Sequence, residues 1–359
     1  MNKVRQLIFV VLAMYASAAA LAYEAGDFLI GSVDAKGRYV FDLPDKQSQC
    51  DTSLQDRATE YLGKRSPELY AKYAATHPEL KQHFNVSSFV RPESIGAVVP
   101  EEINQVMNQV WIWPDDPLKP VKLFAVLNAL DGGASVPCWN LLAGDWTEFE
   151  IHVPKDDSRE FRVLQRAARP SSILKIITPR EKVIRNEVFR RFDEVWCDEV
   201  KQSPVTKKCL PRVVHPETTA MAKRLLAIPS IQQQLSESFR HTMTADNTVL
   251  VGMQRFNTGV NGKNHSFVFA HVFDWPLSRD DSIMVVADLT TGRLCEYIDN
   301  EYIAHYVLQG VLTSANNVTD AWVVSVSYYE GHQKAILQPE YKNGQCSIKK
   351  VMMTGYSGL

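Results

Sequence analysis

The stretch TVLVGMQRFNTGVNGKNHSFVFAHVFD, from Thr248 to Asp274, carries the clearest fold signal in the chain. Its two halves, Thr248–Phe256 and Ser266–Asp274, are rich in β-branched and aromatic residues, as is typical of strands. The glycine- and asparagine-rich segment 259–264 between them predicts a hairpin turn. Side chains two residues apart project from the same face of a strand. One face of the second strand therefore carries four rings: His265, Phe267, Phe269 and His271.

The remainder of the C-terminal region continues this strand-rich pattern. Further extended segments are predicted at Ser282–Leu289, Trp322–Glu330, Gln333–Gln338 and Cys346–Met353. A single helix, from about Asn300 to Thr313, is expected to interrupt them. We therefore expect a mostly antiparallel C-terminal β-sheet.

The middle of the chain, about 158–246, has a mostly helical pattern. Apolar residues recur near the helical period over Pro179–Val200, which predicts one amphipathic helix. Pro216 opens a second helix, Pro229 ends it, and Ser230 caps a third that runs to about His241.

The N-terminal half has a mixed pattern, with a hairpin over Phe28–Phe41 and short helices beginning near Ser66 and Thr76. A helix is also predicted at Glu101–Val110, followed by strands at Val121–Leu130 and Trp146–Val153. The expected fold class is α+β: a mixed N-terminal half, a helical middle and a mostly antiparallel C-terminal sheet. The expected organisation is a signal peptide at 1–22, a mixed and helical region at 23–245 and a strand-rich region at 246–359, with a soft boundary that also allows one continuous domain.

The first 22 residues have the three parts of a secretory signal peptide. Lys3 and Arg5 precede an apolar core at Leu7–Tyr15, and Ala20-Leu21-Ala22 offers a small-x-small cleavage pattern. That core is shorter than the roughly 20 residues of a membrane-spanning helix. We expect cleavage before Tyr23, export to the periplasm or the medium, and a soluble mature chain without a transmembrane span.

Composition and charge exclude several classes of protein. In 359 residues, 45% are hydrophobic and 22% are charged, which is ordinary globular usage and unlike a disordered or collagenous chain. Lys and Arg total 39 against 41 Asp and Glu, so the formal charge is −2. This balance makes nucleic acid an unfavoured partner.

All six cysteines lie in the predicted mature chain, and an even number in an oxidising compartment favours disulfides. The number of cysteines leaves many pairings open. Proximity along the chain suggests Cys197–Cys209 and Cys295–Cys346, which would leave Cys50–Cys138. No Cys-x-x-Cys occurs, so neither a redox dithiol nor a zinc knuckle is indicated.

A thiol nucleophile is the sharpest catalytic hypothesis. Cys138 follows a glycine-containing turn and is predicted to begin a helix, a position that lowers a thiol pKa. His265 and Asp288 follow on two predicted strands, with His271 as a replacement for His265. This order of Cys, His and Asp resembles that of papain-like and transglutaminase-like enzymes, although the Gln that papain-like enzymes place shortly before the nucleophile is missing. The resemblance implies that Cys138 attacks a carbonyl carbon, His265 accepts its proton and Asp288 orients the imidazole.

The segment from Arg159 to Arg191 is basic, with ten Lys or Arg against three Glu, a local balance of 10 − 3 = +7. Such a segment could bind an anionic envelope component or an acidic protein surface. It could equally be a solvated face that acidic neighbours balance. The candidate binding residues are Arg162, Arg166, Arg169, Arg185, Arg190 and Arg191.

Neither a metal site nor a cofactor is predicted from the motifs. Two functions remain. The favoured one is an exported, disulfide-stabilised protein that binds an unknown protein or an anionic component of the cell envelope or the exterior. The alternative is a secreted cysteine hydrolase or acyltransferase that acts on amide bonds through Cys138, His265 and Asp288.

Overall fold

The protein is described by a computed structural model that covers most of the C-terminal half and separate parts of the N-terminal half. The described residues are 25–33, 39–43, 49–50, 52–54, 56–58, 60–61, 88–114, 116–129, 138–144, 161–167, 174–177, 183–185, 215–274, 282–299, 305–314, 319–328, 331–354 and 357–358.

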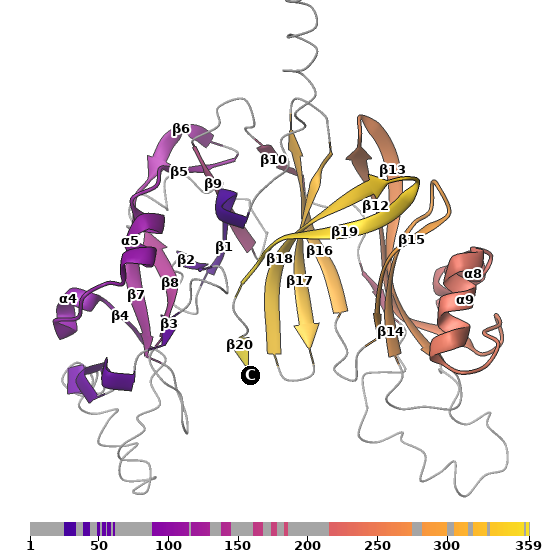
Figure 1. The fold of residues 1–359 in the computed structure, drawn as a ribbon, viewed down its shortest axis with the longest axis horizontal. Helices are drawn as coiled ribbons and strands as arrows, with labels where there is room; N and C mark the ends of the chain where they lie inside the picture. The colour runs from indigo at the N-terminus through magenta and orange to yellow at the C-terminus, as the bar shows by residue number, and fades with distance from the viewer. Residues whose placement is uncertain are drawn as a thin grey trace, which may run out of the picture.

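Three antiparallel sheets dominate the fold (Figure 1). Sheet I has nine strands: β4 (Ser88–Val90), β7 (Leu123–Ala129), β8 (Cys138–Gly144), β2 (Tyr39–Asp42), β1 (Phe28–Val33), β9 (Phe161–Arg166), β5 (Trp111–Trp113) and β6 (Asp116–Val121) in spatial order, with β3 (Gln49–Cys50) paired to β8. Sheet II has six strands: β10 (Leu174–Ile177), β16 (His305–Ser314), β17 (Ala321–Tyr328), β18 (Gly331–Lys342) and β19 (Gln345–Met353), with β20 (Ser357–Gly358) paired to β18. Sheet III has five strands: β11 (Ile184–Arg185), β12 (Thr248–Val260), β13 (Lys263–Asp274), β14 (Ser282–Asp288) and β15 (Arg293–Asp299).

Helices are few and short in the part of the chain that the structure describes. They are α4 (Pro92–Ile95), α5 (Glu101–Met107), α8 (Pro216–Leu226) and α9 (Pro229–Ser238), with 3-10 turns at Ala25–Asp27 and Thr52–Leu54 and further helical residues at 56–58 and 60–61. The fold is therefore mostly β, and the predicted α+β class with a helical middle is wrong. No helix of the described residues is long and apolar enough to cross a membrane.

Two segments that are predicted to be helical contain strands, and the cause is visible for the second of them. Ile184 and Arg185 form β11 within the predicted helix Pro179–Val200, and residues 305–314 form β16 where a helix is expected at about Asn300–Thr313. β16 is buried on both faces, with Leu308 facing sheet III and Leu312 facing sheet I. A strand buried on both sides loses the alternation that marks a strand, and a bulge between Leu308 and Gly310 shifts it further. The rest of the predicted Pro179–Val200 helix, after residue 185, lies outside the described residues.

The strands predicted in the C-terminal region are confirmed, as β12, β13, β14, β17, β18 and β19. β12 and β13 form the predicted hairpin, in which Val260 pairs with Lys263 across Asn261 and Gly262. Both turn residues have positive φ, 49° and 74°, as a two-residue hairpin of this kind requires. Helix α8 begins at Pro216 as predicted, whereas α9 begins at Pro229 rather than at a Ser230 cap.

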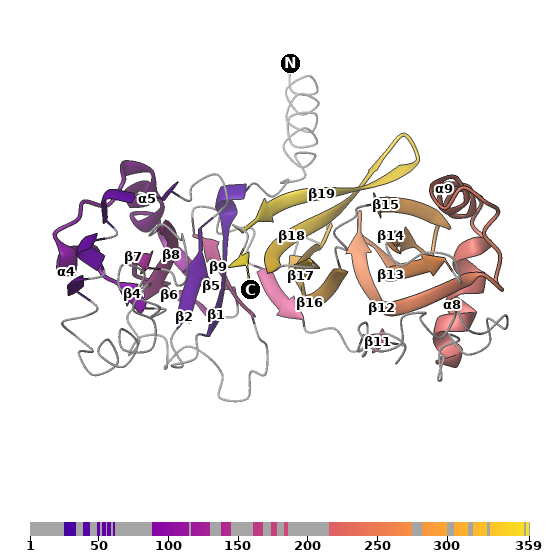
Figure 2. The ribbon, with the colours of Figure 1, turned by 90° about the horizontal axis from the view of Figure 1, so that it is seen from below.

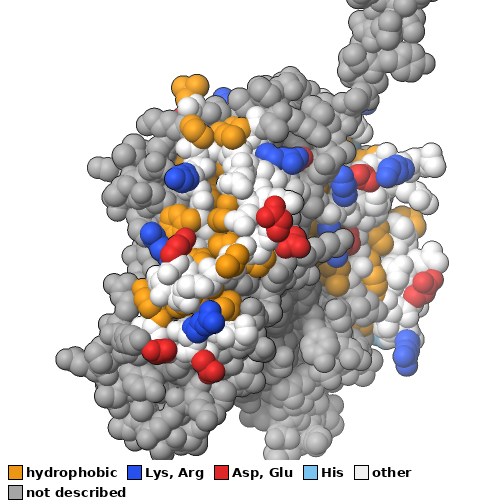
Figure 3. All heavy atoms as spheres, turned by 60° about the vertical axis from the view of Figure 1, so that its left-hand side comes forward, with side chains coloured by type: hydrophobic (Ala, Val, Ile, Leu, Met, Phe, Trp, Pro, Cys, Tyr) orange, Lys and Arg blue, Asp and Glu red, His pale blue; other side chains and the backbone are white. Residues whose placement is uncertain are grey.

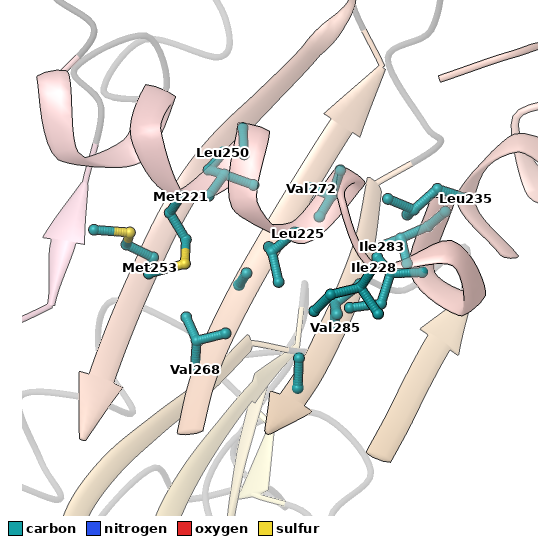
Figure 4. Packing of buried hydrophobic residues seen from close by; sticks show 14 of the residues in the cluster. Met221, Leu225, Ile228, Leu235, Leu250, Met253, Val268, Val272, Ile283 and Val285 are labelled. Atoms are coloured by element: carbon teal, nitrogen blue, oxygen red, sulfur yellow. The ribbon is translucent and has the colours of Figure 1, made fainter. Parts of the chain in front are cut away.

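The longer strands of sheets II and III, β12–β19, each contribute to two cores, because successive side chains of a strand point to opposite faces. On β13, Val268 and Ala270 pack toward α8 and α9, whereas Phe267 and Phe269 face sheet II. Figure 4 shows the first of these cores, where apolar side chains of the two helices meet those of sheet III.

Sheet II continues the stack toward sheet I. On β17, Trp322 faces sheet III, whereas Val323 packs against Phe28 and Val163 of sheet I. A further apolar core lies between sheet I and α5. Figures 1 and 2 show the resulting layers, with α8 and α9 at one end and sheet I at the other.

Strand pairing crosses the boundary predicted near residue 245. β10 belongs to the middle of the sequence yet pairs with β16 of sheet II. β11 pairs with β12 of sheet III in the same way. The domain organisation itself stays a prediction.

One side chain joins sheets III and II along the seam between β12 and β16. The Gln254 amide nitrogen donates to the Leu308 carbonyl at 3.2 Å, and its oxygen accepts from the Leu308 N–H at 2.7 Å. All of these groups are buried, so the Gln254 side chain takes the place of a neighbouring strand for that residue.

We expect Gln254→Ala to lower the free energy of unfolding by about 1–3 kcal/mol, because it leaves a buried N–H and a buried C=O without partners. Urea unfolding followed by circular dichroism would measure the change. Gln105→Ala, on the exposed face of α5, is the matched control and should stay within about 0.5 kcal/mol of the parent. Equal effects of the two substitutions would contradict the role given to Gln254.

Candidate functional site

Two of the predicted catalytic residues meet in sheet III. His265 lies near the start of β13 and Asp288 ends β14, and these two strands pair with Phe267 opposite Asp288. The His265 Nδ1 lies 2.8 Å from the Asp288 Oδ2. The Asp288 side chain is fully buried, while 12% of the His265 side chain is exposed. His265 and Asp288 therefore form a hydrogen-bonded dyad in which His265 is partly accessible to solvent.

The Asp288 carboxylate accepts four hydrogen bonds. Besides His265, its donors are the Thr291 hydroxyl at 2.6 Å, the Thr290 N–H at 2.8 Å and the Tyr341 hydroxyl. Burial by itself raises the pKa of Asp288, but these hydrogen bonds outweigh burial and hold the pKa below its ordinary value. The carboxylate is therefore ionised at neutral pH.

Tyr341 brings the opposite sheet into the site. It lies on β18 of sheet II, and its ring centroid is 5.6 Å from that of His265. Burial raises the pKa of Tyr341, and its hydrogen bond to the negative Asp288 raises it further. The phenol therefore stays protonated and donates to Asp288, which links sheets II and III.

A disulfide reinforces the same junction. Cys295 on β15 is bonded to Cys346 on β19, with Cα atoms 4.5 Å apart, so this predicted pairing is confirmed. Cys346 is the cross-strand partner of Tyr341. The covalent bridge therefore holds the hairpin that carries the Tyr341 hydroxyl against sheet III.

A second buried carboxylate lies near this end of the two sheets. The Asp320 Oδ2 accepts from the Gly259 N–H at 2.5 Å and from the Thr258 hydroxyl at 3.1 Å. Burial raises the pKa of Asp320, because these two donors do not compensate for the lost water. Asp320 thus ties the end of β12 to the start of β17.

The dyad could orient an imidazole for proton transfer, since a carboxylate on Nδ1 directs Nε2 outward. The nucleophile predicted for it lies elsewhere. Cys138 begins strand β8 in sheet I, so the expectation that it starts a helix is wrong. Sheet II lies between sheet I and sheet III (Figure 1), and the described residues do not bring Cys138 to His265. His271, the predicted alternative to His265, is buried further along β13.

Of the arginines proposed for a basic binding surface, Arg162 and Arg166 have described side chains, and neither is a free surface cation. Arg162 on β9 is buried, and its guanidinium donates to the Phe161 carbonyl. Arg166 pairs with Asp27 at 2.6 Å, which neutralises it. Figure 3 shows one face of the molecule, where charges of both signs are interspersed among apolar side chains. Arg185 lies on β11, and the remaining predicted residues, Arg169, Arg190 and Arg191, lie outside the described residues.

Sequence reasoning missed the other two side chains of the site. Thr291 follows Asp288 by three residues, just before Gly292, which has a positive φ of 65°. The run Asp288-Leu289-Thr290-Thr291-Gly292 is a turn signal that could have placed the Thr291 hydroxyl and the Thr290 N–H beside the carboxylate. No local signal places Tyr341 there, because it comes from another sheet.

The comparisons with known proteins add no relative. No protein-family model, no curated protein sequence and no solved structure matches the chain. Within the described ranges, no group of three or more His, Cys, Asp or Glu residues is arranged to hold a metal ion.

Proposed function

We propose that this is an exported, disulfide-stabilised protein that binds a partner in the cell envelope or outside the cell. The N-terminal signal pattern supports export, and the Cys295–Cys346 bridge fits an oxidising compartment. Binding is favoured over catalysis because every donor around Asp288 serves to hold parts of the protein together.

The observation that carries this proposal is that the Asp288 carboxylate forms hydrogen bonds with residues in or next to three exposed turns. The turn at 290–292 is bonded to Asp288 directly, through Thr290 and Thr291. His265 follows the turn at 261–262, and Tyr341 precedes the turn at 343–344. All three turns are exposed. Binding residues are commonly presented on loops that a rigid scaffold holds in place, and we call this surface the turn platform.

The charges of the turn platform favour an acidic partner. Lys263 and Arg293 are both exposed on it. The Arg293 guanidinium lies beside Gly344, where a methyl group would be 3.6 Å from it. The negative Asp288 lies beneath the surface and already has its donors. Acidic groups on a protein or an envelope polymer would complement the exposed cations.

Charge reversal on the turn platform would test this function. We expect Lys263→Glu with Arg293→Glu to weaken partner binding about tenfold or more, since both exposed cations of the turn platform are reversed while the four described hydrogen bonds to Asp288 come from other residues. The purified mature chain would be cross-linked to extracts of its own cell envelope and medium, and the captured partner would be quantified for each variant.

Lys223→Glu on α8 is the matched control, because it reverses an exposed charge away from the platform. Full binding by the control and weak binding by the platform variant would support the proposal. Equal capture by both variants, or no captured partner at all, would count against it.

A further inference from the structure

We propose that Cys50 and Cys138 form a second disulfide, which fastens β3 to β8 in sheet I. β3 pairs with β8 in antiparallel register, with Gln49 opposite Trp139 and Cys50 opposite Cys138. The two cysteines are 138 − 50 = 88 positions apart in the sequence, so their pairing is a product of the fold.

The backbone geometry suits a bridge. Directly opposite residues in an antiparallel pair have Cα atoms about 4.5 or 5.5 Å apart, depending on the hydrogen-bonding pattern. Disulfides span Cα separations of about 4.4–6.8 Å, so either kind of pair can be bridged without backbone movement. The Cys295–Cys346 bridge of this protein has a Cα separation of 4.5 Å.

The other two cysteines in the described ranges are not available as partners for Cys50 or Cys138. Cys295 and Cys346 are bonded to each other, which leaves Cys50 and Cys138 among the cysteines in the described ranges. A slip of one residue would turn one of these cysteines to the opposite face of the sheet, so their direct opposition is informative. The strand β3 has only two residues, and a covalent bond would hold this short strand on the sheet.

The bond forms by thiol–disulfide exchange with a disulfide oxidant, either a protein or a small molecule. One cysteine thiolate attacks the oxidant and releases its first thiolate, which gives a mixed disulfide. The thiolate of the second cysteine then attacks the sulfur of the first cysteine in that mixed disulfide and releases the other thiolate of the oxidant. The two cysteines lose two electrons and two protons, and the oxidant becomes a dithiol or two thiols.

This bridge bears on function without resting on partner binding. A bridged Cys138 has no thiolate, and the thiolate is the nucleophilic form of cysteine. The cysteine-hydrolase hypothesis would then have no nucleophile at this position. The partner-binding function could fail while the bridge stands, because sheet I lies away from the turn platform.

Peptide mapping of the exported full-length protein would test the proposal. The native protein is unfolded in the presence of an alkylating agent and without a reductant, and is then digested with trypsin. Cleavage after Lys and Arg places Cys50 on peptide 47–57 and Cys138 on peptide 123–155. We expect these two peptides to be joined and unalkylated, with a mass that separates into the two components after reduction.

The Cys295–Cys346 bridge is the internal control, because it must join peptides 294–334 and 343–349 in the same digest. In a Cys50→Ser variant, Cys138 should become fully alkylated without reduction. Alkylation of Cys138 in the unreduced native protein would overturn the proposal. A bridge from Cys138 to any other cysteine would also overturn it.

Discussion

Asp288→Ala should lower the free energy of unfolding by about 3–5 kcal/mol, because it removes a buried charge that four donors surround. The Tyr341 hydroxyl and the His265 Nδ1 would lose their described acceptor, and one of the links between sheets II and III would be broken. Chemical unfolding monitored by tryptophan fluorescence would measure the loss. Asp246→Ala, in an exposed turn, is the matched control and should change the free energy by less than about 0.5 kcal/mol.

The same residue predicts the direction of the acid sensitivity. Because the folded-state pKa of Asp288 lies below its ordinary value of 3.8, Asp288 stabilises the fold at pH values above 3.8. This stabilisation is lost as the pH falls from 3.8 through the folded-state pKa. An Asp288→Asn variant should therefore be less stable than the parent at neutral pH and should lose less stability on acidification. Parallel pH profiles for the two proteins would contradict the role of the ionised carboxylate.

Trp322→Ala should also cost about 3–5 kcal/mol, because it empties the centre of the core between sheets II and III. Trp322 is fully buried, and its ring centroid lies 5.1 Å from that of Phe256 and 4.7 Å from that of Phe267. Its indole N–H also donates to the Thr258 hydroxyl at 3.1 Å. Thermal and urea unfolding would measure the effect.

Two controls separate the causes of that loss. Trp322→Phe keeps an aromatic ring and should cost less than Trp322→Ala, since it leaves a smaller cavity. Val98→Ala removes an apolar side chain that is 88% exposed, and it should be nearly neutral. A Trp322→Ala protein as stable as the Val98→Ala protein would show that this ring does not support the core.

Half of the candidate site could be predicted from the sequence. His265 and Asp288 are recognisable because each lies at the end of a predicted strand, and the structure joins them at 2.8 Å. Tyr341 could not be predicted, since it is 53 residues from Asp288 and comes from a different sheet. The glycine-containing turn before Cys138 predicts a helix start, but Cys138 begins strand β8, whose pairing with distant strands a local turn signal does not encode.

By itself, the sequence determined the local features of this protein. The strands of the 248–274 hairpin and the positive-φ turn at Asn261-Gly262 follow from residue type, because the backbone preferences of neighbouring residues act over short distances. The closeness of Cys295 and Cys346 along the chain also suggested their bridge correctly. The tertiary structure alone decided that 305–314 is a strand, that Cys50 lies opposite Cys138 and that Tyr341 reaches Asp288. These features depend on burial against residues far away in the chain, and no local preference encodes which distant face a segment will cover.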